Sequence, residues 1–244
     1  MRKLAAFLVP TLLLLFLVSP PLSAQVGNPG KVVNPNLATQ AQLQKLPHVT
    51  AAISEVIEDG RPYLTMEKLD DKLAEHLGET ERQALYVTMF VPINLNAATK
   101  REIDLVPGMT RKMHHEFEEY RPYKKLAQFR REMGKYVDKE EVARFEQYVF
   151  VPLDLNSATA EEILTIPGVG KRMLHEFEEY RPYRNIAQFR REIGKYVDKN
   201  ELARLERYVF IKGQKSEKAK TGEKPGTVKD SGKGKKGGAK GTNR

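Results

Sequence analysis

The sequence predicts an all-α protein built from three copies of a unit of about 60 residues. Three observations support this fold class: an internal repeat with a period of 60, helix-start signals at the same place in each copy, and apolar residues at helical spacing. Val91 to Phe150 matches Val151 to Phe210 at 39 of 60 positions without a gap. A more diverged copy covers residues 31 to 90, and the last unit extends to residue 211.

Each unit is expected to begin its first helix with a capping box, in which a threonine is followed three residues later by Gln or Glu. The pairs are Thr39 with Gln42, Thr99 with Glu102, and Thr159 with Glu162. A proline should end this helix, because the residue before proline is disfavoured in helical conformation. These prolines are Pro47, Pro107 and Pro167.

Three further short helices are expected in each unit, and the last unit shows them most clearly. The apolar positions at helical spacing are Val169, Met173, Phe177 and Tyr180, then Ile186, Phe189 and Ile193, then Leu202, Leu205 and Val209. We interpret them as core residues. A core of 60 residues is marginal by itself, and the connections between units are very short, so neighbouring units should stack and share apolar surface.

The N-terminal residues 1 to 24 have the layout of a secretory signal peptide. Arg2 and Lys3 precede an apolar run from Leu4 to Val18, and cleavage is expected near Ala24. An uncleaved anchor is the alternative, but the run is shorter than the roughly 20 residues needed to span a bilayer. We therefore expect a periplasmic or secreted protein without a stable membrane anchor.

The C-terminal residues 212 to 244 are rich in Lys and Gly and are predicted to be a disordered basic tail. This tail holds 11 Lys and Arg against 3 Asp and Glu, and the whole chain has a net charge of +9. Residues 25 to 211 carry a net charge of −1, so the folded part is not basic. The chain has no cysteine, which excludes disulfides and thiolate metal sites.

The most specific motif lies between the first two helices of the last unit, in the run Ile166-Pro167-Gly168-Val169-Gly170-Lys171-Arg172. This run resembles the helix-hairpin-helix motif, and the preceding Asp154-Leu155-Asn156-Ser157-Ala158-Thr159 resembles the start of the modules in ComEA-type competence proteins. The resemblance extends over all three units and implies tandem helix-hairpin-helix folds. It also implies a partner, double-stranded DNA, held by its phosphates.

The resemblance assigns a DNA-binding role to five residues of this loop. Gly168 and Gly170 would be the loop glycines, Val169 the apolar plug between the helices, and Lys171 with Arg172 the charged flank. Glycines let the backbone approach a ligand closely, and the amides at a helix start attract anions.

The other two units carry less of the motif. The second unit keeps Gly108, Arg111 and Lys112, but it has Thr110 in place of the second glycine. We expect threonine to be a poor substitute if that position needs a positive φ. The first unit has neither glycine, with His48 and Thr50 at these places. The sites of a second hairpin, at Tyr136 to Lys139 and Tyr196 to Lys199, read as ordinary helix starts.

The main alternative to DNA binding is a hairpin fold used structurally, in an extracytoplasmic scaffold that binds an envelope protein. The pairs Arg130-Arg131 and Arg190-Arg191 are expected to pair with nearby acids rather than with phosphate. The histidines His114, His115 and His175 have no second ligand at metal-binding spacing. We expect no catalytic residue, metal, cofactor or small-molecule substrate.

Overall fold

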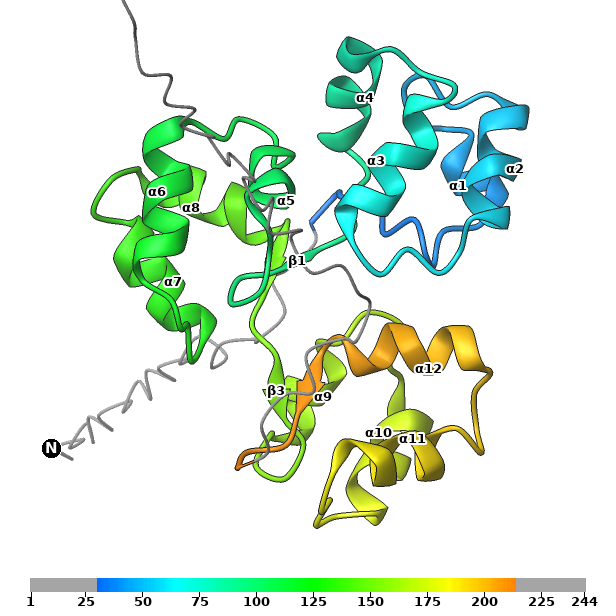
Figure 1. Ribbon diagram of the computed structural model, residues 1–244, viewed down its shortest axis with the longest axis vertical. Coiled ribbons are helices and arrows are strands. Elements are labelled where there is room, and N and C mark those ends of the chain that lie inside the picture. The colour runs from blue at the N-terminus through cyan, green and yellow to red at the C-terminus, as the bar shows by residue number, and fades with distance from the viewer. Residues whose placement is uncertain (1–29, 214–244) are drawn as a thin grey trace, which may run out of the picture. The chain divides into compact units, whose positions relative to one another are not determined.

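The computed structural model describes residues 30 to 213, and this part of the chain is predominantly helical (Figure 1). Its helices form three groups of four, coloured from blue through green to orange, which match the three sequence repeats. Residues 1 to 24, interpreted as a signal peptide, and nearly all of the tail lie outside the described residues. Between residues 30 and 213 no helix is long and apolar enough to cross a membrane.

The helices fall close to the predicted positions. The first repeat contains α1 (Gln40–Leu43), α2 (Ala51–Asp59), α3 (Met66–Ala74) and α4 (Glu79–Tyr86). The second contains α5 (Lys100–Asp104), α6 (Arg111–Glu119), α7 (Leu126–Met133) and α8 (Lys139–Glu146). The third contains α9 (Ala160–Leu164), α10 (Lys171–Glu179), α11 (Ile186–Ile193) and α12 (Lys199–Glu206).

The capping boxes are present as predicted. Thr39, Thr99 and Thr159 each cap the first helix of their repeat, and the side chain three residues later binds the backbone N–H of the cap. Asp138 and Asp198 cap α8 and α12 through their carboxylates. These bonds satisfy amides that a helix start would otherwise leave unpaired, which is why the helices begin where they do.

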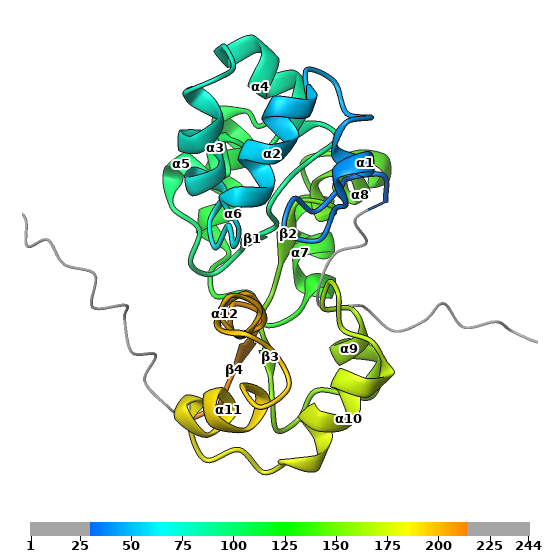
Figure 2. The same cartoon turned by 90° about the vertical axis from the view of Figure 1, so that its right-hand side faces the viewer.

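Short parallel strand pairs join the two ends of each repeat, a feature that the all-α prediction did not include. Strand β1 (Ile93–Asn94) pairs with β2 (Val149–Phe150), and β3 (Leu153–Asp154) pairs with β4 (Val209–Phe210) (Figure 2). In the first repeat Val33 and Met89 form a single bridge of the same kind. Strands of two residues are too short to leave an alternating pattern in the sequence.

The Arg-Pro-Tyr segment after the second helix is tied to the start of its own repeat. In the second repeat the Arg121 guanidinium donates to the carbonyls of Leu95 and Ala98, at 2.6 and 2.9 Å. The Asn96 side chain accepts from the Tyr123 N–H at 2.6 Å and donates to the Tyr123 carbonyl at 2.8 Å. In the first repeat Arg61 and Asn36 make the matching bonds. In the third repeat Asn156 makes both of its bonds to Tyr183, and Arg181 donates to the Ala158 carbonyl.

The apolar core is divided unequally among the repeats. The first and second repeats share one continuous cluster of buried side chains, so the expectation that neighbouring repeats share core is correct for this pair. The third repeat has its own cluster, which includes Phe150 from the end of the second repeat. The second and third repeats are therefore joined more narrowly.

Polar contacts add to the junction between the first two repeats. Asp70 in α3 is buried and receives hydrogen bonds from Arg82 at 2.9 Å, Arg101 at 2.7 Å and the Tyr86 hydroxyl at 2.6 Å. Arg101 belongs to α5 of the second repeat and also donates to Asp71 at 2.5 Å. At the junction between the second and third repeats, the Lys125 Nζ lies 3.7 Å from Oε1 of Glu162, which is longer than the contacts of Arg101 at the first junction.

Candidate nucleic-acid interface

In all three repeats, the loop between the first and second helices has a residue with a left-handed backbone conformation at the same position. Its φ is +72° at Gly108 and +81° at Gly168, as expected for glycine. In the first repeat His48 adopts a φ of +61° at the equivalent place. The first loop thus keeps the turn although it lacks the glycine.

Because Gly108 and Gly168 have no side chain, an arginine can pack close to each of these loops. A Cβ at Gly108 would lie 2.8 Å from Nη2 of Arg144, and one at Gly168 would lie 2.9 Å from Nη2 of Arg204. Arg144 also donates from Nη1 to the Pro107 carbonyl. These arginines recur at the repeat period in α8 and α12, but the motif did not point to them.

The third loop makes a further contact that the sequence did not indicate. The Leu37 side chain of the first repeat would lie 3.2 Å from a Cβ at Gly168. At Gly168, an exposed residue, protein atoms fill the side on which a Cβ would stand, whereas at Gly170 that side is open, with no atom near the missing Cβ. Of the two glycines, only Gly170 has open space on the side on which a side chain would stand.

The positive φ that would make Thr110 a poor substitute for glycine is absent from this position. Thr110 has φ −107° and ψ 159°, and Gly170 has φ −105° and ψ −178°, so both are extended. Any residue adopts this conformation, and an N-cap position favours threonine. The Thr110 hydroxyl accepts from the Met113 N–H at 3.2 Å and caps α6.

The start of α10 differs from that of α6 because Gly170 has no side chain to cap it. Its first amides therefore have no acceptor from a capping side chain, and they lie beside the open space at Gly170. The helix dipole adds about half a positive charge at such an end. Within the described part of the chain this is the hairpin whose helix start is most open to an anion.

The predicted cationic residues are exposed at both helix starts. Arg111, Lys171 and Arg172 form no ion pair with any residue between 30 and 213. The Lys112 Nζ lies 5.0 Å from the ring centre of Tyr136, so this cation faces an aromatic ring. Val169 is 8% exposed and packs in the core of the third repeat.

The arginine pairs Arg130-Arg131 and Arg190-Arg191 form ion pairs with nearby glutamates, as the sequence predicted. Arg131 binds Glu132 at 2.6 Å and Arg191 binds Glu192 at 2.7 Å. Arg190 binds Glu206 at 2.6 Å, and Arg130 pairs with the matching Glu146. These cations are already neutralised within the fold.

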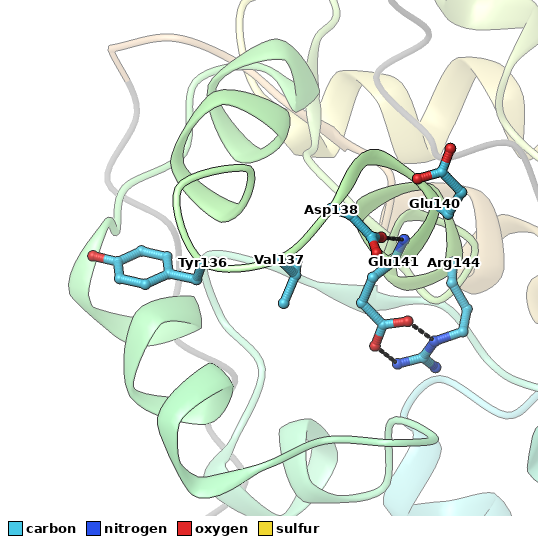
Figure 3. Close-up of a pocket in the computed structure, with 6 residues that line it drawn as sticks. All are labelled: Tyr136, Val137, Asp138, Glu140, Glu141 and Arg144. Carbon is cyan, nitrogen blue, oxygen red and sulfur yellow. Dashed lines mark hydrogen bonds and ion pairs between the residues drawn. The ribbon is translucent and has the colours of Figure 1, made fainter.

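A pocket of about 640 Å³ lies at the second-hairpin position of the second repeat (Figure 3). It is lined by Tyr136, Val137, Asp138, Glu140, Glu141 and Arg144. The one basic side chain in this lining, Arg144, binds both carboxylate oxygens of Glu141, at 2.7 and 2.5 Å. With three carboxylates and one paired cation in its lining, the pocket is acidic and offers no free cation to a phosphate. The turn is a helix start, as expected, since Asp138 caps α8.

The first repeat lacks the elements of an anion site. Ala51 and Ala52 occupy the positions of the basic pair, and the Thr50 hydroxyl caps α2 by accepting from the Ile53 N–H at 3.3 Å. His48 is 3.8 Å from Glu81. The left-handed turn remains, but the residues described in this loop include neither the glycine nor the basic pair.

The histidines of the second helices lie beside carboxylates. His114 is 2.5 Å from Asp104 and 3.5 Å from Glu118, and His175 is 3.5 Å from Glu179 one helical turn away. Residues 30 to 213 hold no group of three His, Cys, Asp or Glu residues placed to bind a metal ion.

The candidate residues thus form two separate sites, one on each hairpin. Gly168 to Arg172 lie together at the start of α10, and Gly108, Arg111 and Lys112 lie together at the start of α6. Within the described residues no hydrogen bond or ion pair joins one site to the other. Comparison with known proteins found no protein-family model, no curated protein and no solved structure that matches the chain.

Proposed function

We propose that this protein is an exported, non-enzymatic helix-hairpin-helix repeat protein that binds double-stranded DNA through its phosphates without sequence specificity. The observation that carries the proposal is the start of α10, where a left-handed glycine turn leads into a helix without a side-chain cap. Two exposed cations without ion pairs among the described residues, Lys171 and Arg172, flank it. A role in DNA uptake follows from the resemblance to ComEA-type modules.

The chemistry supports phosphate rather than a base edge as the contact. Unpaired helix amides and flexible cations neutralise a charged oxygen without reading sequence. The start of α6 offers a weaker version, because the Thr110 hydroxyl uses one amide and Lys112 lies over Tyr136. We therefore rank the third hairpin above the second, and the first is not expected to bind.

Binding by the repeats alone should be weak. Residues 25 to 211 carry a net charge of −1, whereas the tail supplies 11 of the basic residues. Cations on the tail would release counterions from DNA and add affinity that falls with salt. The predicted signal peptide would direct this activity outside the cytoplasm.

The first prediction concerns Lys171 and Arg172. Changing both to alanine should remove up to two bound phosphates and lower the slope of log affinity against log salt by about 0.9 for each phosphate that is no longer neutralised. Affinity should fall alike for duplexes of different sequence. Fluorescence anisotropy with labelled duplexes, over a range of salt concentrations, measures both effects.

The matched control is the Arg111→Ala, Lys112→Ala variant, which removes the same charge from the second hairpin. It should change the salt slope less. Binding that is equal to wild type in both variants and abolished by deletion of residues 212 to 244 would assign DNA binding to the tail. Absence of DNA binding by the wild-type protein at low salt would contradict the proposed function.

A second candidate function, a scaffold that docks onto another protein, is favoured by one observation. Phe210 at the end of the third repeat is 45% exposed, which is unusual for an aromatic side chain in a packed repeat. DNA binding and docking onto a protein are compatible, since Phe210 lies in β4 and not in a loop that carries candidate DNA-binding residues.

A further inference from the structure

The same surface is covered at the end of the first two repeats and uncovered at the end of the third. Phe90 and Phe150 close the first and second repeats and are 1% and 0% exposed. Phe210, one period further, is 45% exposed. Met66 and Leu126 are likewise buried, whereas Ile186 at the same position is only partly buried. We call Ile186 and Phe210 the open end.

A tyrosine of the following repeat covers each buried phenylalanine. The ring centres of Phe90 and Tyr148 lie 5.1 Å apart in an edge-on arrangement, and those of Phe150 and Tyr208 lie 4.5 Å apart. The Tyr148 hydroxyl also donates to the Val87 carbonyl at 3.2 Å. Both rings of each pair are buried, so this contact is a repeated part of the interface.

At the first junction the capping-box glutamate of the second repeat binds across the interface. One carboxylate oxygen of Glu102 accepts from the Thr99 N–H at 3.2 Å, at the start of its own helix. The other oxygen accepts from the Met66 N–H at 3.0 Å, at the start of α3 in the preceding repeat. A single buried carboxylate thus caps two helices, which requires two acceptor oxygens.

The first repeat has neither a capping-box glutamate nor the tyrosine that packs on the preceding repeat. Its box residue is Gln42, whose one oxygen accepts from the Thr39 N–H at 2.8 Å, and its other terminal atom is a donor. Thr88 stands where the later repeats have Tyr148 and Tyr208. A second copy of this chain cannot therefore cover the open end in the way that one repeat covers another.

We propose that the open end is a docking surface for a helical unit of a different protein, one that presents a capping-box glutamate and a tyrosine. Continuity with the internal junctions points to this partner: a tyrosine of the following repeat packs on the phenylalanine at both junctions, and the capping-box glutamate binds across the interface at the first. The residues after Gly213 contain no aromatic side chain that replaces the tyrosine. Docking at the open end does not depend on DNA binding.

The test supplies the missing features on a second copy of the chain. The probe is the mature protein with Gln42→Glu, Thr88→Tyr and Phe210→Asp, which gains the covering face and has its own open end blocked. Mixed with wild-type protein, it should form a complex of one to one stoichiometry in sedimentation velocity. Its affinity for wild type should exceed the self-affinity of wild type by about tenfold or more.

The matched control replaces wild type in the mixture by the Phe210→Asp variant, which should not bind the probe. Circular dichroism of each protein checks that it is folded. A folded probe that leaves wild type monomeric would show that the open end does not accept such a unit and would overturn the proposal. Wild-type protein that oligomerises alone, and stops doing so with Phe210→Asp, would instead identify the occupant as a second copy and overturn the choice of partner.

Discussion

At the scale of single residues, the hairpin loops show how one backbone angle restricts the choice of amino acid. Gly108 and Gly168 lie in the left-handed region, and each also allows an arginine to pack closely behind it. Gly170 has an extended backbone and open space around it. In the sequence motif the two glycines of the third loop appear equivalent, but only Gly168 has a backbone conformation that favours glycine.

This difference predicts opposite outcomes for two substitutions in one loop. Gly168→Ala should lower the free energy of unfolding by about 1–3 kcal/mol, because its φ is positive and the new methyl group would press on Arg204 and Leu37. Gly170→Thr should change it by less than about 0.5 kcal/mol, since threonine is a good N-cap. Urea unfolding of the two variants measures both values.

The Gly170→Thr variant also separates folding from binding. If phosphate approaches the amides of α10, the added side chain should weaken DNA binding while the protein stays as stable as wild type. Equal destabilisation by both substitutions would mean that Gly170 has a structural role that its open surroundings do not reveal.

At the scale of helices, charged side chains join α3 and α5 across the first junction. Burial opposes ionisation of Asp70, but hydrogen bonds from Tyr86, Arg101 and Arg82 outweigh it and hold its pKa below the ordinary 3.8. A carboxyl with a lowered pKa stabilises the fold above its ordinary pKa, and this stability is lost as the pH falls below it. The junction should therefore weaken in acid.

The corresponding prediction compares Asp70→Asn with wild type. At neutral pH the variant should lose about 2 kcal/mol of unfolding free energy, because two arginines and a tyrosine no longer have a charged acceptor. The difference should shrink as the pH falls below 3.8 and disappear below the lowered pKa, where Asp70 of the folded protein is protonated too. Asp71→Asn is the control, since this carboxylate is 63% exposed and should matter little. A difference that is independent of pH would show that the Asp70 charge is not responsible.

At the scale of the whole repeat array, the division of the core suggests two blocks that the buried ring of Phe150 couples into one cooperative unit. The first and second repeats share a cluster, whereas the third has its own and receives Phe150 from its neighbour. In repeat proteins the stability depends on the repeats themselves and on the contacts between neighbours. The narrower junction should be the easier one to separate.

Phe150→Ala is the prediction at this scale. Removing this fully buried ring should cost about 3–5 kcal/mol and uncouple the third repeat, so that thermal unfolding shows two steps instead of one. Calorimetry of the mature protein would resolve the steps. Phe210→Ala is the matched control, because its ring is exposed and its removal should leave a single transition. One cooperative transition in both variants would indicate that the core is continuous across all three repeats.

The sequence by itself determined the repeat period, the approximate position of each helix between residues 30 and 213, and the caps. The helices and caps depend on residues a few positions apart, which is why local patterns record them, and the repeat period follows from comparing the sequence with itself. The tertiary structure decided the strand pairing, the packing of Arg204 and Leu37 behind the third loop, and the open end at Phe210. Those features depend on residues that lie far apart in the chain, as Leu153 and Val209 do, and no local pattern encodes which of them meet.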